Sequence, residues 1–463
     1  MPLPKEFIAE IEPLLEKEMS AFLASIEKEA PVSIRVNPWK MKGDPLVPAQ
    51  KLTPVPWTNY GYYLPHRPAF TFDPLFHAGY YYVQEAASMF VEYVARKLIK
   101  KPVTCLDLCA APGGKSLALI AALPEGSLLV SNEVVRSRAN ILAEIIVKSG
   151  NPDLFVANNT PSDFAGLPHF FDMILVDAPC SGEGMFRKDE GAVREWSPAN
   201  VQMCAARQRD ILSDVWHALK PGGYLVYSTC TFNRNENEEN ALWIARELGA
   251  EFVSIDVEPT WNITPAFDDE AIGFRFFPHK TQGEGFFITI LQKISSERDP
   301  ATSGKKCKTK PSSLLNSCDS VAPYLKKMES FRFFEENSRL TALPEHHHEK
   351  MLLLHNRLKG MTFGIELGSF KGRHFIPSHA LAMSTAVHAD AFPRCSLSYE
   401  KAIAYLRGES LVLTNVAKGF VLLTYQNVPL GLVKSVGNRA NNLYPNAWRI
   451  RSRNIPETKN FPF

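Results

Sequence analysis

The 463-residue chain has few cysteines and no long apolar segment, and both absences exclude classes of protein. Its 8 cysteines are too sparse for a disulfide framework. No apolar run approaches the roughly 20 residues that a transmembrane helix requires. The first residues lack the apolar core of a secretion signal, and the sequence shows no internal repeat. We therefore expect a cytoplasmic, monomeric globular protein with reduced thiols and no membrane partner.

Charge is distributed unevenly along the chain, although the net charge is only +2. Residues 1–300 carry 28 Lys and Arg against 38 Asp and Glu, a balance of −10. Residues 301–463 carry 23 against 11, a balance of +12. A basic module attached to an acidic one is typical of a protein that binds a polyanion.

Hydrophobic patterns divide the chain into four stretches. Residues 1–100 begin with an amphipathic helix pattern over 1–30 and continue as an irregular α/β lead-in with short strands. Residues 101–295 alternate strands and helices, which predicts a doubly wound, mainly parallel α/β sheet. Residues 296–319 are polar and lysine-rich, and we interpret them as a linker. A second folded region, of α+β type, is predicted over 320–463.

Apolar runs locate the expected strands. In the central stretch they are 103–107, 127–134, 154–158, 171–178, 223–229 and 286–292. Helices are predicted between them, for example over 139–148 and 201–219. Beyond the linker the expected strands are 410–416, 419–425 and 430–434.

A turn of small residues at 106–116 follows the first predicted strand and opens a helix. Its end resembles a phosphate-binding P-loop, but that motif requires glycine where Cys109 stands. The alternative ligand is S-adenosylmethionine, whose carboxylate and ammonium groups fit against such a turn. That ligand also requires an acid after the second strand to accept hydrogen bonds from ribose hydroxyls. Glu133 stands at this place, so the sequence favours S-adenosylmethionine.

Two further predicted strands end in cysteine. Cys180 follows Asp177-Ala-Pro, and Cys230 follows Tyr227-Ser-Thr. Ligands of doubly wound sheets lie beyond the carboxyl ends of the strands, so both thiols should face one crevice. Neither belongs to a Cys-x-x-Cys pair and no histidine cluster accompanies them, so no metal is expected.

A thiol, an acid and a methyl donor at one site suggest a single reaction. C5 of a pyrimidine is too weakly nucleophilic to attack a sulfonium ion unaided, but a thiolate that adds to C6 makes C5 enamine-like. Asp177 would bind the N3/N4 edge of a cytosine and stabilise its protonated form. Lys115 would lower a thiol pKa, orient Asp177, or hold the loop.

Five cysteines fall outside this site. We interpret three as small buried side chains and two as linker residues: Cys105, Cys204 and Cys395, and Cys307 and Cys318. The three histidines at 346–348 are predicted to lie on the surface rather than to bind a metal.

Together these motifs resemble those of the Sun-type RNA cytosine-C5 methyltransferases. The matching segments are 35–37, 79–88, 106–116, 132–133, 177–182 and 228–231. The resemblance implies a Rossmann-like class I methyltransferase domain in which Cys230 is the nucleophile and Cys180 assists release of the methylated RNA. It also implies these cofactor contacts: Cys109, Ala110, Ala111, Pro112, Gly113, Gly114, Lys115, Glu133 and Asp177.

One position departs from the family pattern. Members usually carry an aspartate after the third strand, facing the adenine amino group, and this chain has Asn158-Asn-Thr160 there. We expect Thr160 to take this place, with Asn159 and Asp163 as alternatives.

The C-terminal stretch resembles the extension of the bacterial 16S ribosomal RNA branch of this family. The matching segments are 372–382, 430–434 and 441–449. The resemblance implies a PUA-like RNA-binding region and 16S ribosomal RNA, or the small ribosomal subunit, as partner. Independently, a set of basic and aromatic residues suits phosphate contact and base stacking: Lys434, Arg439, Arg449, Arg451 and Arg453, with Tyr444 and Trp448.

Other functions compete with methylation of ribosomal RNA as interpretations of these motifs. A transfer RNA cytosine-C5 methyltransferase remains an alternative. A P-loop hydrolase is disfavoured by Cys109 and by the missing Walker-B partner. A non-catalytic RNA-binding factor is disfavoured because Asp177, Cys180 and Cys230 are intact. DNA cytosine-C5 enzymes use the Pro-Cys thiol as nucleophile, and the second thiol at Cys230 favours RNA.

Overall fold

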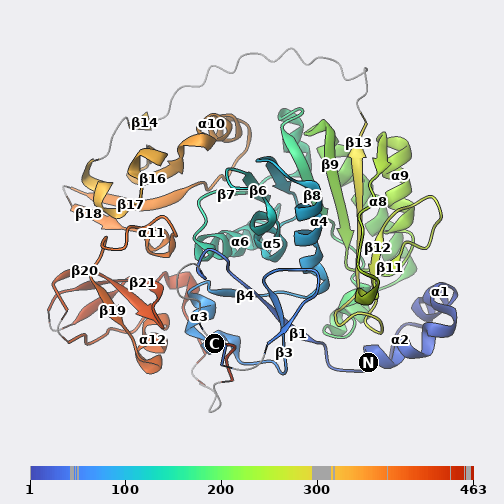
Figure 1. Cartoon of the computed structure of the whole chain (residues 1–463), viewed down its shortest axis with the longest axis horizontal. Coiled ribbons are helices and arrows are strands. Elements are labelled where there is room, and N and C mark those ends of the chain that lie inside the picture. The colour runs from blue at the N-terminus through green and yellow to red at the C-terminus, as the bar shows by residue number, and fades with distance from the viewer. Residues whose placement is uncertain are drawn as a thin grey trace.

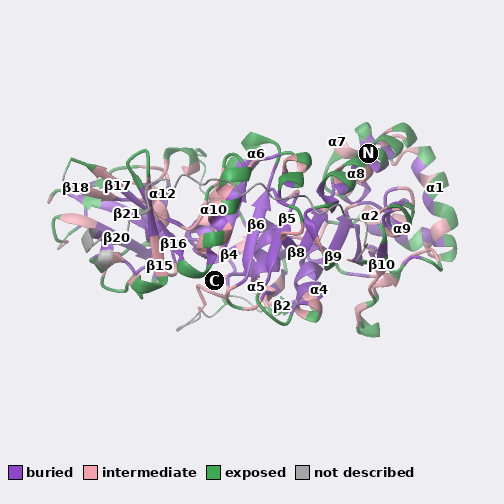
Figure 2. Cartoon of the chain, turned by 90° about the horizontal axis from the view of Figure 1, so that it is seen from above, coloured by how far each residue is buried: buried purple, intermediate pink, exposed green. Residues whose placement is uncertain are grey.

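The computed structural model describes residues 2–41, 46, 48–49, 52–294, 314–315, 319–372, 374–414, 416–437, 439–452, 454 and 460–463. In Figure 1 the C-terminal region lies to the left of a central sheet with helices on its faces, and the strands of a small N-terminal unit lie below that sheet, where this unit shares a core with the C-terminal region. Buried residues are concentrated in the sheets of all three parts (Figure 2). Within these residues, no helix has both the length and the apolar character that a membrane crossing requires.

The central sheet confirms the predicted doubly wound architecture. Its main strands are β5 (Thr104–Asp107), β6 (Leu128–Asn132), β7 (Leu154–Ala157), β8 (Phe171–Asp177), β9 (Leu219–Thr229) and β13 (Phe286–Lys293). They lie in the order β13-β9-β8-β5-β6-β7. The ladders between β9, β8, β5, β6 and β7 are parallel, and β13 is antiparallel to β9. Short strands extend the β13 side: β10 (Ala250–Phe252), β11 (Thr264–Pro265) and β12 (Phe274–Phe276).

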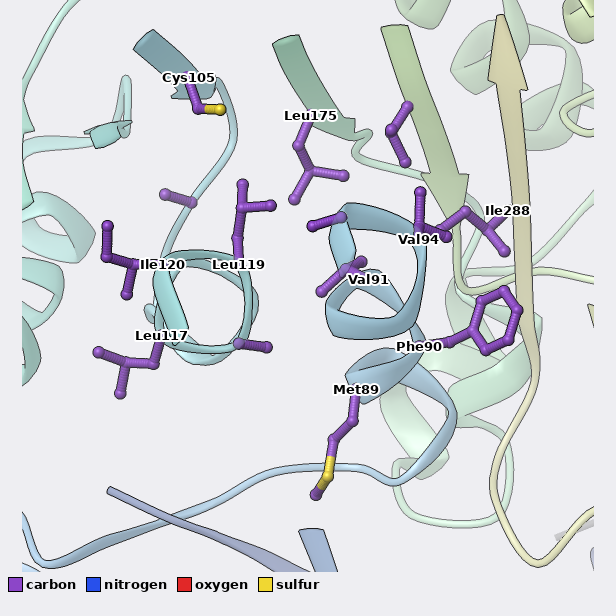
Figure 3. Close-up of a cluster of buried hydrophobic side chains, with 14 of the residues drawn as sticks. Met89, Phe90, Val91, Val94, Cys105, Leu117, Leu119, Ile120, Leu175 and Ile288 are labelled. Carbon is purple, nitrogen blue, oxygen red and sulfur yellow. The ribbon is translucent and has the colours of Figure 1, made fainter. Parts of the chain in front are cut away.

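Helices cover both faces of this sheet, because its parallel strands are apolar on both sides. They are α4 (Phe90–Leu98), α5 (Gly114–Ala122), α6 (Arg136–Ser149), α8 (Pro198–Trp216) and α9 (Glu238–Glu247). Leu119 of α5 and Val94 of α4 are fully buried; in Figure 3 Leu119 points toward Leu175 of β8, and Val94 lies beside Ile288 of β13. Burying one such side chain contributes about 1.5–3 kcal/mol. This packing holds the helix that begins at the glycine turn rigidly against the sheet.

The N-terminal unit combines helices with a small sheet. The sheet has the order β2 (Thr53–Pro54), β3 (Gly61–Leu64), β1 (Val32–Val36) and β4 (Tyr81–Val83). The continuous helix predicted over 1–30 is instead divided into α1 (Lys5–Leu15), η1 (Glu16–Glu18) and α2 (Met19–Ile26). Pro13 lacks the backbone donor that a helix interior needs, and Glu16 has a φ of 46°, outside helical geometry.

The C-terminal region contains two sheets. The first is β14 (Leu314–Leu315), β15 (Phe331–Glu336), β16 (Arg339–Pro344), β17 (Ile365–Lys371) and β18 (His374–Pro377). The second is β19 (Arg394–Ser396), β20 (Gly419–Tyr425), β21 (Val428–Ser435) and β22 (Ala440–Asn442). β14 lies within the stretch predicted as linker, whereas residues 295–313 lie outside the described residues. The strand predicted over 410–416 is wrong, because its described residues form only an isolated bridge from Leu411 to Ala440.

The C-terminal region packs along strand β7. Val156 of β7 forms an antiparallel bridge with Thr362. His347 lies before α10 (His348–Arg357), is fully buried, and its Nε2 lies 3.0 Å from Asp153 Oδ1. The prediction of a surface histidine cluster is therefore wrong for His347, because docking of this region covers it.

Candidate active site

The glycine turn brings the backbone close to its neighbours. Gly113 has a φ of 122°, a conformation that side chains other than glycine rarely adopt. It precedes α5, and a Cβ added at Gly114 would lie 2.9 Å from the Tyr82 ring. The turn therefore packs closely against the N-terminal sheet and helix α6, at a place where no larger residue fits.

Two acids lie beside this turn. Glu133 follows β6 and is only 3% exposed, and its Oε2 lies 3.4 Å from Arg138. Arg138 also donates to the Ala111 carbonyl, at 2.9 Å, so it links the acid to the glycine turn. Asp107 accepts a hydrogen bond from Ser116 Oγ at 2.6 Å, and its other carboxylate oxygen has no partner among the described residues. A buried acceptor without a partner fits a ligand that carries an ammonium group.

The residues of the loop after β7 form two separate sets of hydrogen bonds, one with the C-terminal region and one within the loop. The Asn159 side chain accepts from Lys359 N at 2.9 Å and donates to Lys359 O at 2.8 Å. The amide nitrogen and oxygen of Asn159 thus both contact the C-terminal region, and a contact of Asn159 with adenine stays a prediction. Thr160 and Asp163 form an exposed capping box in which Thr160 Oγ1 donates to Asp163 Oδ2 at 2.8 Å. Their contact with a cofactor stays a prediction.

Lys115 and Asp177 meet at the carboxyl edge of the sheet. Lys115 Nζ lies 2.9 Å from Asp177 Oδ2, and Ser228 Oγ donates to Asp177 Oδ1 at 2.8 Å. Burial disfavours the charge of Lys115, but Asp177 and Cys230 outweigh it and raise the pKa of Lys115 above its usual value. The site therefore holds a fixed positive charge beside a thiol. Ser228 was missed from the sequence, although it lies only two residues before Cys230.

The two predicted cysteines converge. Cys180 Sγ and Cys230 Sγ lie 3.0 Å apart, and both residues are half-buried rather than sealed in the core. The contact with Cys230, together with burial and the charge of Glu236, raises the pKa of the Cys180 thiol well above its usual value. Lys115, in contrast, carries its charge near Cys230. The two thiols therefore lie in different electrostatic surroundings, with a carboxylate beside Cys180 and an ammonium group beside Cys230.

The other cysteines follow the predictions only in part. Cys105 and Cys204 are buried, as expected for structural side chains. Cys395 is only half-buried, because it lies on β19 at the end of its sheet. Cys307 and Cys318 lie outside the described residues.

The aromatic residues predicted to stack on RNA bases are positioned differently. Tyr444 is 2% exposed, its hydroxyl lies 3.3 Å from His77 Nδ1, and it therefore belongs to the core between the N-terminal and C-terminal parts. Trp448 is partly buried and packs on Lys148 and His379. Lys434, Arg439 and Arg451 are exposed, as a phosphate-binding role requires, and Arg449 is half-buried. Arg453 lies outside the described residues.

The strand order, the glycine turn after β5 and the acid after β6 define a class I methyltransferase fold. A ribosomal RNA small subunit methyltransferase F from Salmonella agona (strain SL483) is 31% identical over 96% of this chain and 95% of its own length. The chain therefore belongs to the RsmB/F family of 16S ribosomal RNA methyltransferases.

Family profiles match three parts of the chain. Residues 99–292 match the 16S rRNA methyltransferase RsmB/F, and residues 3–86 match the N-terminal domain of 16S rRNA methyltransferase RsmF. Residues 392–450 match the RsmF PUA domain, so this match covers the second C-terminal sheet and not the first.

Solved structures support the fold. A methyltransferase homologue from Pyrococcus horikoshii is 25% identical with a TM-score of 0.54, and the alignment covers 63% of this chain and 95% of that one. NSun6 from the same organism, solved with SFG, is 20% identical with a TM-score of 0.51, over 63% of this chain and 99% of that one. Both matches span about the length of the N-terminal unit and the central sheet.

Proposed function

We propose that this protein transfers a methyl group from S-adenosylmethionine to C5 of a cytosine in 16S ribosomal RNA, with Cys230 as covalent nucleophile. The observation that carries the proposal is the 3.0 Å approach of the Cys180 and Cys230 sulfur atoms at the carboxyl ends of β8 and β9. The Lys115–Asp177 ion pair lies beside them, and the glycine turn before α5 opens at the same edge of the sheet.

The residues around the glycine turn fit the cofactor. The glycines admit its amino acid portion, the unpartnered oxygen of Asp107 suits its ammonium group, and Glu133 suits its ribose hydroxyls. The full set that would hold it is Cys109, Ala110, Ala111, Pro112, Gly113, Gly114, Lys115, Glu133, Thr160 and Asp177. When bound, S-adenosylmethionine supplies an electrophilic methyl group.

The chain's own groups then account for the reaction. The Cys230 thiolate adds to C6 of the cytosine and makes C5 electron-rich enough to be methylated. Asp177 hydrogen-bonds the N3/N4 edge and stabilises the protonated base, while Lys115 orients Asp177 and favours the thiolate. After methylation a base removes the C5 proton, the C5–C6 double bond re-forms, and the bond between C6 and Cys230 breaks. Cys180 assists this release from its position against the departing sulfur.

The basic surfaces of the chain suit an RNA substrate. The matched PUA domain carries the exposed Lys434 and Arg439. A second basic surface follows the groove between α2 and residues 278–283, where Lys28, Arg67 and Lys188 are among the lining residues. Positive charge on both sides of the central sheet would hold the RNA backbone while one base reaches the cysteines.

A pair of substitutions tests the chemistry. Cys230→Ala should abolish methyl transfer to 16S ribosomal RNA, and Cys180→Ala should trap a protein–RNA adduct that survives a denaturing gel. Cys395→Ala is the matched control and should leave transfer unchanged. If Cys230→Ala kept its activity and Cys180→Ala lost it without an adduct, the two roles would be reversed. Bisulfite sequencing of 16S ribosomal RNA from cells without the gene would identify the modified cytosine.

A further inference from the structure

Glu236 lies behind the two cysteines, is fully buried, and holds the chain on both sides of Cys180. The Ser181 backbone N–H donates to Glu236 Oε2 at 3.0 Å. On the other side, Gln208 Nε2 donates to Glu236 Oε2 at 2.6 Å and to the Pro179 carbonyl at 3.0 Å. The Glu236 carboxylate thus holds Ser181 directly and Pro179 through Gln208, which are the residues immediately after and before Cys180.

The same network reaches the loop of the second cysteine. Asn233 Nδ2 donates to Glu236 Oε1 at 2.8 Å and to Thr231 Oγ1 at 2.9 Å. The hydroxyls of Ser181 and Thr231 lie 3.1 Å apart. Each cysteine is followed by a residue with a hydroxyl group. The contact between these two hydroxyls joins the loop of Cys180 to the loop of Cys230.

Burial raises the pKa of Glu236 and the charge of Glu183 adds to this, whereas the hydrogen bonds from Ser181, Asn233 and Gln208 favour the ionised carboxylate. Its three partners, the Ser181 N–H and the amide groups of Gln208 and Asn233, all donate hydrogen bonds. The orientation of both amides is fixed, because Gln208 Nε2 also donates to the Pro179 carbonyl and Asn233 Oδ1 accepts from Glu236 N. With donors on every side, a proton on the carboxylate would have no acceptor.

The two thiols therefore experience opposite charges. Cys180 faces the Cys230 sulfur, the Glu236 carboxylate and the hydroxyl of Tyr227. Cys230 faces Cys180 and Lys115. The more distant Cys204 thiol is near both the Glu236 carboxylate and Cys230. The negative charge beside Cys180 favours its protonated form, whereas the charge beside Cys230 is positive.

We propose that Glu236 is a positioning residue that holds both cysteine loops together and, by its charge, keeps Cys180 in the thiol form so that Cys230 is the nucleophile. This inference rests on the proposed function and explains how two neighbouring thiols take different roles. The Cys180 S–H then donates a hydrogen bond to the Cys230 thiolate. When the bond from Cys230 to C6 breaks, its electron pair returns to the Cys230 sulfur, and the same hydrogen bond stabilises that charge.

The pH dependence of alkylation of the two thiols tests the proposed role of Glu236 without RNA or cofactor. The full-length protein is treated briefly with iodoacetamide between pH 6 and 10, and the initial rate at each cysteine is read from its peptide by mass spectrometry. In the wild-type protein Cys230 should react at lower pH than Cys180. In Glu236→Gln the pH midpoint of Cys180 should fall by one unit or more, which raises its rate at pH 8 about tenfold. An unchanged Cys180 midpoint would overturn the proposal, as would a Cys180 that reacts at lower pH than Cys230 in the wild-type protein.

Two further variants separate the effect of the Glu236 charge from the effect of disturbing a buried carboxylate. Glu236→Asp keeps the charge and should keep the Cys180 midpoint within a few tenths of a unit of the wild-type value; a fall as large as that of Glu236→Gln would contradict a role for charge. Glu92→Gln removes another buried carboxylate, which contacts Arg35 in the N-terminal unit, and should leave both midpoints unchanged. Failure of Cys230→Ala to abolish methylation would reject the proposed function instead, so the two results are distinguishable.

Discussion

Lys115 Nζ lies 2.9 Å from Asp177 Oδ2 at the carboxyl edge of the sheet, and both side chains keep part of their surface exposed. The pair joins the first turn of α5 to the end of β8, which are brought together by the parallel pairing of β5 with β8. The ion pair therefore lies between the glycine turn and the cysteines, where both charges can contact a substrate.

We expect Lys115→Met to lower the single-turnover rate of methyl transfer at least 100-fold, because the charge that orients Asp177 and favours the Cys230 thiolate is lost. Lys220 provides the matched control: its Nζ pairs with Asp172 at 2.7 Å, near the opposite ends of β8 and β9. Lys220→Met should change the rate less than threefold. Equal losses in the two variants would show that a general fold defect, and not the site, is responsible.

The glycine turn should not tolerate a side chain. Gly113→Ala forces a φ near 122° on alanine, and we expect affinity for S-adenosylhomocysteine, measured by calorimetry, to fall at least tenfold. Gly222 has a φ of 74° with no atom within 4 Å of an added Cβ, so Gly222→Ala imposes a milder positive-φ strain away from the site and controls for loss of a surface glycine. If both variants bound the ligand equally well, the turn would not be the cofactor site.

The basic residues of the PUA domain and its C-terminal flank should contribute a salt-dependent part of RNA affinity. Replacing the exposed Lys434, Arg439 and Arg451 by alanine should reduce the slope of log affinity against log salt by about 2, or about 0.7 for each lost phosphate contact on single-stranded RNA. Affinity is measured by filter binding at several salt concentrations. Lys101→Ala, exposed just before β5, should leave the slope within 0.3 of the wild-type value, on the order of a fraction of one contact.

Tyr444 offers the contrasting case. Because its ring is buried against Tyr405 and His379, Tyr444→Ala should destabilise the protein by about 3–5 kcal/mol, measured by chemical denaturation. A variant that kept its stability and lost only RNA affinity would restore the base-stacking interpretation that the sequence suggested.

Stability should depend on pH through Asp107. Burial raises the pKa of this carboxyl to about 7 in the folded protein, whereas an unfolded aspartate titrates near 4. Between these values the folded state holds more protons than the unfolded state, so the free energy of unfolding falls as pH rises, by up to about 1.4 kcal/mol per unit. Asp107→Asn should flatten this dependence in urea denaturation at pH 5 and pH 7. If the free energy of unfolding changed with pH equally in the variant and the wild-type protein, Asp107 would not be the source of the dependence.

Much of the fold and the site follows from short-range patterns. The strands of the central sheet lie within a few residues of their predicted bounds, since apolar runs bounded by turns are local signals. The convergence of Cys180 and Cys230 follows from the general rule that the carboxyl ends of parallel strands meet at one edge.

What the sequence missed depends on contacts between distant segments. His347 looks like a polar surface residue until the C-terminal region docks on β7 and covers it. Tyr444 lies among arginines in the sequence, but its ring enters a core shared with the N-terminal unit. Glu236 gave no signal either, because its partners Ser181 and Gln208 become neighbours only when the loops after β8 and β9 are assembled.

The paired hydrogen bonds between Asn159 and Lys359 have a consequence for how binding events communicate. The segment after β7 that would enclose the adenine is hydrogen-bonded to Lys359, which belongs to the C-terminal region with its two sheets. If this segment encloses the adenine as proposed, a displacement of the C-terminal region on RNA binding would move one wall of the cofactor site. RNA binding and cofactor binding would then be energetically coupled. By thermodynamic reciprocity, each would change the affinity of the protein for the other by the same factor.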